Sequence, residues 1–258
     1  MKKYDFDVAV LGAGSGGYAA ARTAAAAGLK TVVLEGGPEV GGLCILRGCM
    51  PTKALHYAAE VKHLAEHAAT WGLKIPQVSF DWKKVIARKD EQIKDFADFR
   101  VKQLNDGRFK FIRAQAKFLD AHTLALDNGK KVTALHFVVA TGSRVSTPPL
   151  PALEQTGYIT SDEAIRLPKP PKSLIILGGG AIACEFAQFF ARFGVKVTLI
   201  QRSEHLLKEF DAEAGAEVKK VFQREGVQVF TGTQLTDAGR RGKLKGVTFQ
   251  QAGRVITV

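Results

Sequence analysis

Two cysteines close together in the sequence are the residues best suited to chemistry. Cys44 and Cys49 lie within the segment GGLCILRGCMPTK, residues 41–53. A disulfide between them would close a loop so short that it would remove only about 2 kcal/mol of unfolded-state entropy. On an ideal helix the two side chains would lie about 140° apart, so bridging them needs a distorted turn, which Gly48 permits. The pair therefore predicts a redox role and not a structural disulfide.

The residues after the pair favour a reactive thiol. Pro51 fits only in the first turn of a helix, which places Cys49 near a helix N-terminus. Lys53 lies close behind it in the sequence. A helix N-terminus and a nearby lysine both favour the thiolate, and the thiolate is the nucleophile.

A zinc site is the alternative for these cysteines. Cys44, Cys49, His63 and His67 have a spacing close to that of a zinc finger. The segment lacks the β-hairpin of a finger, however, and is flanked by glycines and by Pro-Thr-Lys. We therefore expect His63 and His67, and also His56, to lie on a solvent-exposed helix face.

A glycine-rich turn precedes the cysteines. Residues 8–11 are a short apolar strand, residues 12–17 read GAGSGG, and an alanine-rich helix follows up to Gly28. A second strand, residues 31–34, ends in Glu35. Glycines at such a turn let a pyrophosphate approach the backbone at the helix N-terminus, and the acidic residue accepts hydrogen bonds from a ribose diol. The pattern predicts a dinucleotide site for an unphosphorylated ribose.

The same pattern recurs later in the chain. Strand 174–177 runs into a glycine turn that begins at Gly178, and a helix and strand 197–200 lead to Gln201. The interval from Gly12 to Glu35 equals that from Gly178 to Gln201. Because Gln201 replaces the acid and Arg202 and Lys208 follow, this copy leans towards NADP over NAD. The alternative is two βαβ units that pack without a ligand. Cys184, inside the second helix, is predicted to be a small buried residue.

The elements between the two turns complete a predicted α/β fold. Residues 52–70 are predicted as a helix, Asp81 opens a second helix, and strands are expected at 109–113, 117–119, 123–126 and 135–140. The second helix carries an apolar stripe that we interpret as core packing: Trp82, Val85, Ile86, Ile93, Phe96, Phe99 and Leu104. Prolines 148, 149 and 151, and later 168, 170 and 171, flank an expected interdomain segment.

Composition excludes several classes of protein. The chain has 258 residues, of which 46% are hydrophobic and 24% charged, so it is long enough to bury a core without a disulfide framework. Three cysteines favour a reducing cytosol. The net charge of +12 suits phosphate-bearing cofactors. The basic residues are dispersed along the chain, so they do not predict nucleic-acid binding. No apolar stretch is long enough to span a membrane, and Asp5 and Asp7 favour a first strand over a signal peptide.

Taken together, these motifs resemble the class I pyridine nucleotide–disulfide oxidoreductases, a group that includes dihydrolipoamide dehydrogenase, glutathione reductase and mercuric reductase. The first glycine turn and Glu35 resemble the FAD site, and segment 41–53 resembles the redox-active disulfide motif. Residues 140–143 resemble the second flavin-domain signature, while 161–164 and 178–185 resemble the approach to the NAD(P) site. The resemblance implies tandem Rossmann-like domains with parallel sheets and β-meanders: an FAD-binding domain, 1–150, and a partial NAD(P)-binding domain, 151–258.

The resemblance also implies roles for individual residues. Cys49 is the thiol on the flavin side, Cys44 is the interchange thiol that meets the substrate, and Lys53 and Glu185 match an ion pair beside the reactive flavin nitrogen. The residues implied for FAD are Gly12, Gly14, Ser15, Gly16, Gly17, Glu35, Gly36, Gly42, Leu43, Cys44, Lys53, Ala116, Ala140, Thr141, Gly142 and Ser143. The residues implied for NAD(P) are Gly178, Gly180, Ala181, Ile182, Glu185, Gln201, Arg202 and Lys208. No metal site is expected.

The activity implied is an electron relay from NAD(P)H through FAD to a Cys44–Cys49 disulfide and then to a small disulfide or dithiol substrate, with a dihydrolipoamide dehydrogenase-like substrate favoured. A cytoplasmic homodimer is the expected full-length state. Leu43 and residues 45–47 differ from the residues most common at these positions of the family's disulfide motif. The sequence also stops before the family's C-terminal interface domain. A fragment or a truncated product is therefore expected. The alternatives are a flavin-dependent NAD(P)H oxidase, a quinone or mercuric reductase, and a non-catalytic nucleotide-binding module.

Overall fold

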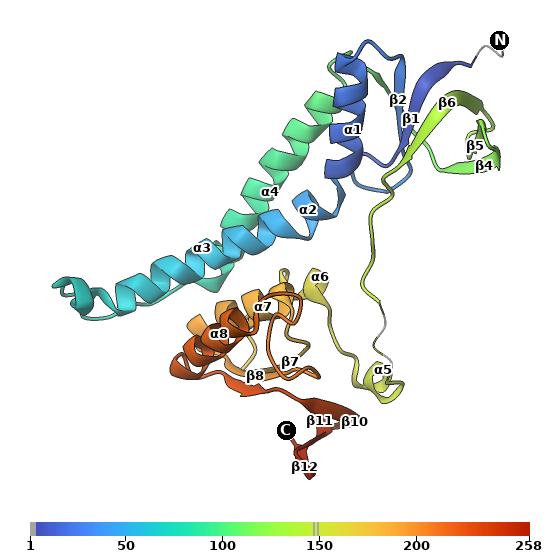
Figure 1. Ribbon diagram of the computed structural model, residues 1–258. Helices are drawn as coiled ribbons and strands as arrows, with labels where there is room; N and C mark the ends of the chain where they lie inside the picture. The colour runs from blue at the N-terminus through green and yellow to red at the C-terminus, as the bar shows by residue number, and fades with distance from the viewer. Residues whose placement is uncertain (1–3, 147, 149) are drawn as a thin grey trace. The chain divides into compact units, whose positions relative to one another are not determined.

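The computed structural model describes residues 4–146, 148 and 150–258, which form two compact units (Figure 1). Unit 1 comprises residues 1–51 and 88–144, and unit 2 comprises residues 52–87 and 145–258. Because the two units alternate along the sequence, they divide the chain differently from the predicted domains 1–150 and 151–258, which remain a prediction. Pro149, one of the prolines expected between those domains, lies outside the described residues.

Unit 1 is built on a mixed six-stranded sheet of order β3-β2-β1-β6-β5-β4. Strands β3, β2, β1 and β6 pair in parallel, and β5 and β4 continue the sheet as an antiparallel meander. The strands are β1 (Phe6–Leu11), β2 (Thr31–Glu35), β3 (Lys110–Arg113), β4 (Ala116–Asp120), β5 (Thr123–Leu126) and β6 (Lys131–Val139). The first five spans agree with the predicted strands to within one or two residues, whereas β6 begins four residues before the predicted residue 135 and ends one residue before the predicted residue 140.

The sheet is buried on both faces, as the uninterrupted apolar run of β1 requires. Val10 and Val33 point to the side where Tyr18 and Ala21 of helix α1 (Ser15–Ala26) pack, together with Leu104. On the opposite face, another cluster gathers Ala9, Leu11, Val32, Leu34, Leu124 and Leu126. Successive residues alternate between the two clusters because side chains of a strand have a period of two.

Two helices belong partly to each unit. Helix α3 (Cys49–Glu66) begins earlier than the predicted residue 52, with Pro51 in its first turn, and the 3-10 helix η1 (Ala68–Trp71) follows it. Helix α4 (Trp82–Leu104) starts directly after Asp81, whose Oδ1 accepts a hydrogen bond from the Lys84 backbone N–H at 3.2 Å. Asp81 therefore opens this helix, as predicted.

Unit 2 contains a parallel three-stranded sheet of order β7-β8-β9 and an antiparallel meander of order β10-β11-β12. Helix α7 (Ala181–Arg192) links β7 to β8, and α8 (Ala212–Arg224) precedes β9. The other elements are α5 (Ala152–Thr156), α6 (Ser161–Ala164), β7 (Ser173–Leu177), β8 (Lys196–Ile200), β9 (Gln228–Phe230), β10 (Thr233–Arg241), β11 (Leu244–Gln251) and β12 (Arg254–Thr257). Unit 2 thus repeats the strand–turn–helix–strand order of unit 1. No helix in the described part of the chain is both long and apolar enough to cross a membrane.

The core of unit 2 is rich in aromatic side chains. The ring centroid of Trp82 lies 5.7 Å from that of Phe189, 6.3 Å from that of Phe190 and 5.3 Å from that of Phe193. The indole N–H of Trp82 donates to the carbonyl of Leu167 at 2.8 Å, so its one polar group is satisfied. The start of α4 is therefore fixed in the core of this unit.

The apolar stripe of α4 was predicted to be core throughout, and for two aromatic residues this is wrong. Trp82, Ile93 and Leu104 are buried, but Phe96 is 44% and Phe99 is 59% exposed. A three-residue step falls about 60° short of a full helical turn. Two such steps separate Phe99 from Ile93, so Phe99 is rotated about 120° away from the buried face of the helix. The buried residues of the stripe, Trp82, Ile93 and Leu104, are spaced eleven residues apart and stay on that face.

A largely buried arginine links α7 to α3 and to the end of α8 within unit 2. Arg192 ends α7 and its side chain is only 10% exposed. Its guanidinium donates to Glu225, directly after α8, from Nε at 3.1 Å and from Nη2 at 2.8 Å, and it also pairs with Glu60 of α3. Burial alone would raise the pKa of Glu225, but hydrogen bonds from Arg192 and its charge bring that pKa below its ordinary value.

We expect Arg192→Met to destabilise unit 2 by about 3 kcal/mol, because it leaves the carboxylate of Glu225, which is only 14% exposed, without its partner. Glu60→Gln is the matched control. The Glu60 side chain is 46% exposed, so its loss should cost about 1 kcal/mol or less. Chemical denaturation of the two variants measures both values. Equal losses would show that Arg192 is not held mainly by Glu225.

We also expect unit 2 to lose stability on mild acidification through His63. Burial, and then the charge of Arg192, lower the pKa of His63 below 6.5. The folded state binds this proton less readily than the unfolded state, so the stability is fully present above pH 6.5 and is lost as the pH falls through the lowered pKa. Thermal midpoints between about pH 7.5 and 5 should fall less steeply in His63→Gln than in the parent chain. Parallel slopes would contradict this.

Candidate functional site

The first glycine turn packs backbone against backbone. Gly12 has φ +102°, and a Cβ there would lie 2.3 Å from the Ala140 carbonyl oxygen. A Cβ on Gly17 would lie 1.8 Å from the Gly12 carbonyl oxygen. Neither position has room for a side chain, so the sequence must place glycine at both.

The turn leads into the N-terminus of a helix that faces open space. The residue before α1, Gly14, has extended backbone angles and provides no side-chain cap. A Cβ on Gly16 would meet no atom within 4 Å. The first backbone N–H groups of a helix lack intrahelical acceptors and attract anions. The start of α1 therefore suits a diphosphate.

Glu35 ends β2 beside the same turn. Its Oε2 accepts a hydrogen bond from the Ala13 backbone N–H at 2.9 Å, and its Oε1 accepts one from the Gly37 N–H at 2.7 Å. These two bonds fix the carboxylate, and each oxygen retains further acceptor capacity. A ribose diol could use it, so the residues present here fit the adenosine diphosphate part of the expected FAD.

The other residues implied for FAD lie around this edge of the sheet. β1 lies between β2 and β6, so the crevice at its carboxyl end is the switch point of the sheet, where nucleotides bind in such folds. Residues 140–143 follow β6, and Ala116 begins β4. The absence of a side chain at Gly36 leaves room for the side chain of Gln115, whose Nε2 donates to the Gly36 carbonyl at 2.7 Å.

The cysteine segment packs directly on the glycine turn. The short helix α2 (Gly42–Leu46) starts at Gly42, which has φ +72° and whose Cβ would lie 2.5 Å from Gly14 Cα. This backbone contact brings Cys44 to the start of α1, where the side chains of Ser15 and Cys49 hydrogen-bond to its sulfur. The dithiol candidate therefore lies at the turn predicted to bind a dinucleotide.

The chain is distorted between the two cysteines, as their spacing requires. Helix α2 ends at Leu46, and α3 starts at Cys49. A Cβ on Gly48 would lie 3.0 Å from the Leu43 carbonyl oxygen and 3.3 Å from Cys44 Cα. The absence of a side chain at Gly48 thus permits the close turn that the sequence predicted.

Both cysteines of the pair are free thiols in the structure, and their surroundings differ. Cys49 is exposed and Cys44 is half-buried. Burial is the main cause that raises the pKa of Cys44, followed by the hydrogen bond and charge of Cys49, while the Ser15 hydrogen bond acts in the opposite direction. Cys184 is buried, as predicted, and burial raises its pKa to about 11.

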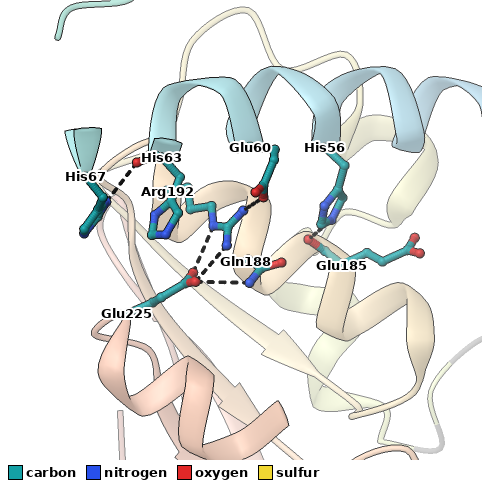
Figure 2. A network of polar contacts seen from close by, with 8 residues as sticks. All are labelled: His56, Glu60, His63, His67, Glu185, Gln188, Arg192 and Glu225. Carbon is teal, nitrogen blue, oxygen red and sulfur yellow. Dashed lines mark hydrogen bonds and ion pairs between the residues drawn. The ribbon is translucent and has the colours of Figure 1, made fainter. Parts of the chain in front are cut away.

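A second group of chemistry-bearing residues lies within unit 2. The Lys53 ammonium and the Glu185 carboxylate form an ion pair. The Nε2 atom of His56 lies 2.7 Å from the Glu185 carbonyl oxygen (Figure 2). The prediction that His56 lies on a solvent-exposed face is therefore wrong. Its helix packs along α7, and the imidazole contacts the backbone of that helix.

The second glycine turn differs from the first in its polar residue. Gly178 has φ +111°, and Gly180 precedes α7 without a side-chain cap. Gln201 is buried, with Cβ and Cγ 3.0 Å from where a Cβ on Gly179 would lie. Arg202 is exposed, as are Ala181 and Ile182, and Lys208 pairs with Glu209 at 3.1 Å. Of the two basic residues implied for NADP, one thus already has an acidic partner.

The zinc alternative gains no support from the described residues, among which no three His, Cys, Asp or Glu side chains gather as metal ligands. Cys49 and His63 lie on one continuous helix, about 21 Å apart along its axis at about 1.5 Å per residue. The Nδ1 atom of His67 lies 2.8 Å from the His63 carbonyl oxygen. His63 is half-buried beside Arg192, so its predicted full exposure is wrong.

The sequence reasoning missed a cationic cluster near the thiols. The Arg100 guanidinium lies 4.2 Å from the centroid of the Tyr18 ring, and its Nη1 is buried without a hydrogen-bond partner among the described residues. Arg108 donates to the Tyr18 hydroxyl at 3.0 Å. Burial is the main cause that lowers the pKa of Arg100, while Tyr18 and Cys44 act against it. Only the alignment of α4 with α1 reveals this cluster.

Comparison with known proteins agrees with this geometry. The family model described as pyridine nucleotide-disulphide oxidoreductase matches residues 6–258. Mercuric reductase from Bacillus cereus is 33% identical over 97% of this chain and 40% of its own length, and dihydrolipoyl dehydrogenase from Bacillus subtilis is 35% identical over 90% and 51%. The chain spans about half the length of the curated relatives it matches.

Solved structures show the same similarity. The HOCl-induced flavoprotein disulfide reductase RclA from Escherichia coli superposes with a TM-score of 0.80 at 26% identity, over 97% of this chain and 54% of that one. A Cu(II) complex of a variant of the same protein gives a TM-score of 0.79. With the family model matching nearly its whole length, the chain belongs to the pyridine nucleotide-disulphide oxidoreductase family.

Proposed function

We propose that this chain is the nucleotide-binding and dithiol-bearing part of an FAD-dependent NAD(P)H–disulfide oxidoreductase. The observation that supports this most directly is the backbone contact of Gly42 on Gly14. It brings Cys44 to the glycine turn whose helix N-terminus and Glu35 suit a dinucleotide. Members of this family depend on FAD and take electrons from NAD(P)H.

The residues of unit 1 supply binding and orientation. The N–H groups at the start of α1 would hold the diphosphate, and Glu35 would hold the ribose hydroxyls. Gly12, Gly17 and Gly42 keep the backbone close enough that no side chain fills the crevice. When bound there, FAD supplies the exchange of an electron pair between NAD(P)H and the dithiol.

The thiol pair supplies the exchange with substrate. When a Cys44–Cys49 disulfide forms, the pair releases two electrons and two protons, and these reduce one substrate disulfide to two thiols. In the role the resemblance gives it, the Cys44 thiolate attacks a substrate sulfur to give a mixed disulfide, and Cys49 then displaces the second substrate thiol. Burial and the neighbouring Cys49 raise the pKa of Cys44, and the Ser15 hydrogen bond offsets part of this in favour of the thiolate that the attack needs.

Lys53 and Glu185 would act as a charged pair beside the electron-transfer path. Their ion pair places a positive charge next to Glu185, while the Lys53 side chain is still 63% exposed. A cation so placed stabilises negative charge that develops during reduction. The substrate class favoured here is a small dithiol or disulfide such as dihydrolipoamide, in a cytoplasmic homodimer of the full-length protein.

Reduction of a thiophilic metal ion is the second candidate. Mercuric reductases from several organisms are 30–36% identical to the chain, and one of the superposed structures is a Cu(II) complex. Thiolates are the ligands that soft metal ions prefer, so the same pair could bind one. Comparing NADPH oxidation driven by lipoamide with that driven by Hg²⁺ in the full-length protein distinguishes the two candidates.

We expect the FAD-loaded chain to take up about two equivalents of dithionite and its Cys49→Ser variant about one, because flavin and disulfide each accept an electron pair. Anaerobic titration followed by flavin absorbance measures this. Cys184→Ser is the control and should behave as the parent chain. Uptake of one equivalent by the parent chain would favour an oxidase that keeps the cysteines without using them. Failure of the folded chain to retain FAD would favour a non-catalytic module.

The cysteines should also differ in alkylation rate. In the reduced, flavin-free chain we expect iodoacetamide to modify exposed Cys49 first, half-buried Cys44 next and Cys184 last. A pKa of about 11 against the ordinary 9.0 lowers the thiolate fraction of Cys184 about 100-fold. FAD should slow the labelling of Cys49 and leave Cys44 as the faster thiol. Peptide mass spectrometry gives each rate. Labelling of Cys49 that FAD leaves unchanged would argue against its flavin-side position.

A further inference from the structure

Helices α3 and α7 are joined within unit 2 by a row of polar contacts, here called the α3–α7 seam, and Figure 2 shows the part of it formed by His56, Glu60, Glu185 and Arg192. The seam consists of the Lys53–Glu185 ion pair, the hydrogen bond from His56 to the Glu185 carbonyl at 2.7 Å, the Glu60–Arg192 ion pair and the hydrogen bond from Lys62 Nζ to the Arg192 carbonyl at 2.7 Å. Every contact of the seam on α7 falls on either Glu185 or Arg192.

The seam has a single register. Glu185 follows Lys53 by 132 positions, and Arg192 follows Glu60 by the same 132. The two helices therefore run in the same direction, and their contacts repeat after two turns on both. A slip of one residue would rotate a helix by about 100° and break every contact together. The seam is thus either in register or absent.

Within the seam, the His56 side chain contacts the backbone of Glu185. The acceptor is a carbonyl oxygen, so the imidazole must donate its Nε2–H. His56 is half-buried, between Leu55 and the stretch that leads to Ala59, both buried in the core of unit 2. It also lines a cavity of about 270 Å³ with Cys184 and Gln188. The imidazole therefore holds the α7 backbone at the residue whose side chain meets Lys53.

The Lys53–Glu185 pair depends on such support. Lys53 is 63% exposed and Glu185 30%, and an ion pair this exposed does little to fix its own geometry. At the far end of the seam, Arg192 is held firmly because Glu225 accepts two of its hydrogen bonds. At the near end, His56 bonds to the Glu185 carbonyl oxygen at 2.7 Å.

We propose that His56 is a positioning residue that keeps Glu185 in register with Lys53. The imidazole fixes the α7 backbone, and the carboxylate of the same residue then meets the ammonium one helical turn earlier on α3. The positional claim stands on the contacts alone. Its consequence for electron transfer rests on the proposed function, in which this ion pair acts beside the flavin.

Carbodiimide cross-linking tests the positional claim, because it joins a lysine and a carboxylate in contact through an amide bond. We expect the Lys53–Glu185 cross-link of the full chain to fall about fivefold in His56→Leu, the factor that one lost hydrogen bond supplies. His56→Gln, whose amide nitrogen can take the place of Nε2, should restore it. The Lys94–Asp98 pair of α4 is the internal control and should cross-link equally in every variant.

Two results would overturn the positional claim. One is an unchanged Lys53–Glu185 yield in a folded His56→Leu chain, even if its thermal midpoint falls. The other is an equal loss in His56→Gln and His56→Leu. If His56→Leu does not fold, His56→Ala takes its place, because it also removes the Nε2–H donor to the Glu185 carbonyl. Its Lys53–Glu185 yield should fall in the same way, and an unchanged yield would overturn the claim.

Stopped-flow reduction of the FAD-loaded chain by NADPH tests the consequence. Flavin reduction should slow in His56→Leu in step with the loss of cross-link and recover in His56→Gln. A parent chain that binds FAD but is not reduced would refute the proposed function and leave the cross-linking result valid. A parent chain that is reduced as fast as His56→Leu would refute the consequence of positioning.

Discussion

The contact between Gly42 and Gly14 is the constraint on which the candidate site of unit 1 depends. Two stretches of backbone approach until a Cβ on Gly42 would lie 2.5 Å from Gly14 Cα. A single methyl group there would separate α2 from the glycine turn and carry Cys44 away from Ser15. Glycine has no side chain to bury, so this contact contributes little apolar stabilisation. Its value is positional, since it joins the thiol pair to the nucleotide crevice.

The second organising constraint is helical continuity. Helix α3 begins with Cys49 and continues without interruption through Lys53, His56 and Glu60. A helix transmits position along its axis because each turn is hydrogen-bonded to the next. Contacts of its later turns with α7 therefore bear on Lys53 and His56, which lie earlier on the same helix within unit 2. In unit 2, the largely buried Arg192 and its two carboxylate partners hold that later part in place.

Local patterns in the sequence predicted most of the elements. Apolar runs predicted β1, β2, β7 and β8, and Asp81 and Pro51 marked where helices begin, because these signals act through neighbouring backbone atoms. Arg192, Glu60 and Glu225 come from three helices that are far apart in the sequence, and no local pattern relates them. The exposure of Phe96 and Phe99 was likewise missed, because an apolar residue on a helix does not reveal which of its faces will be covered.

The contrast between a local sequence signal and packing in the folded structure also bears on which nucleotide the second glycine turn binds. In the sequence, Gln201 stands where an acid would reject a 2′-phosphate, and its replacement of that acid favours NADP. The structure buries that side chain beneath Gly179, where its Cβ and Cγ fill the space next to the glycine backbone. A residue that packs there serves the turn itself. Lys208 pairs with Glu209, but both side chains are more than half exposed, and a pair so exposed leaves the ammonium available to a phosphate. Discrimination by charge therefore rests on two exposed basic residues, Arg202 and Lys208, of which Arg202 has a guanidinium that suits a phosphate in bidentate geometry.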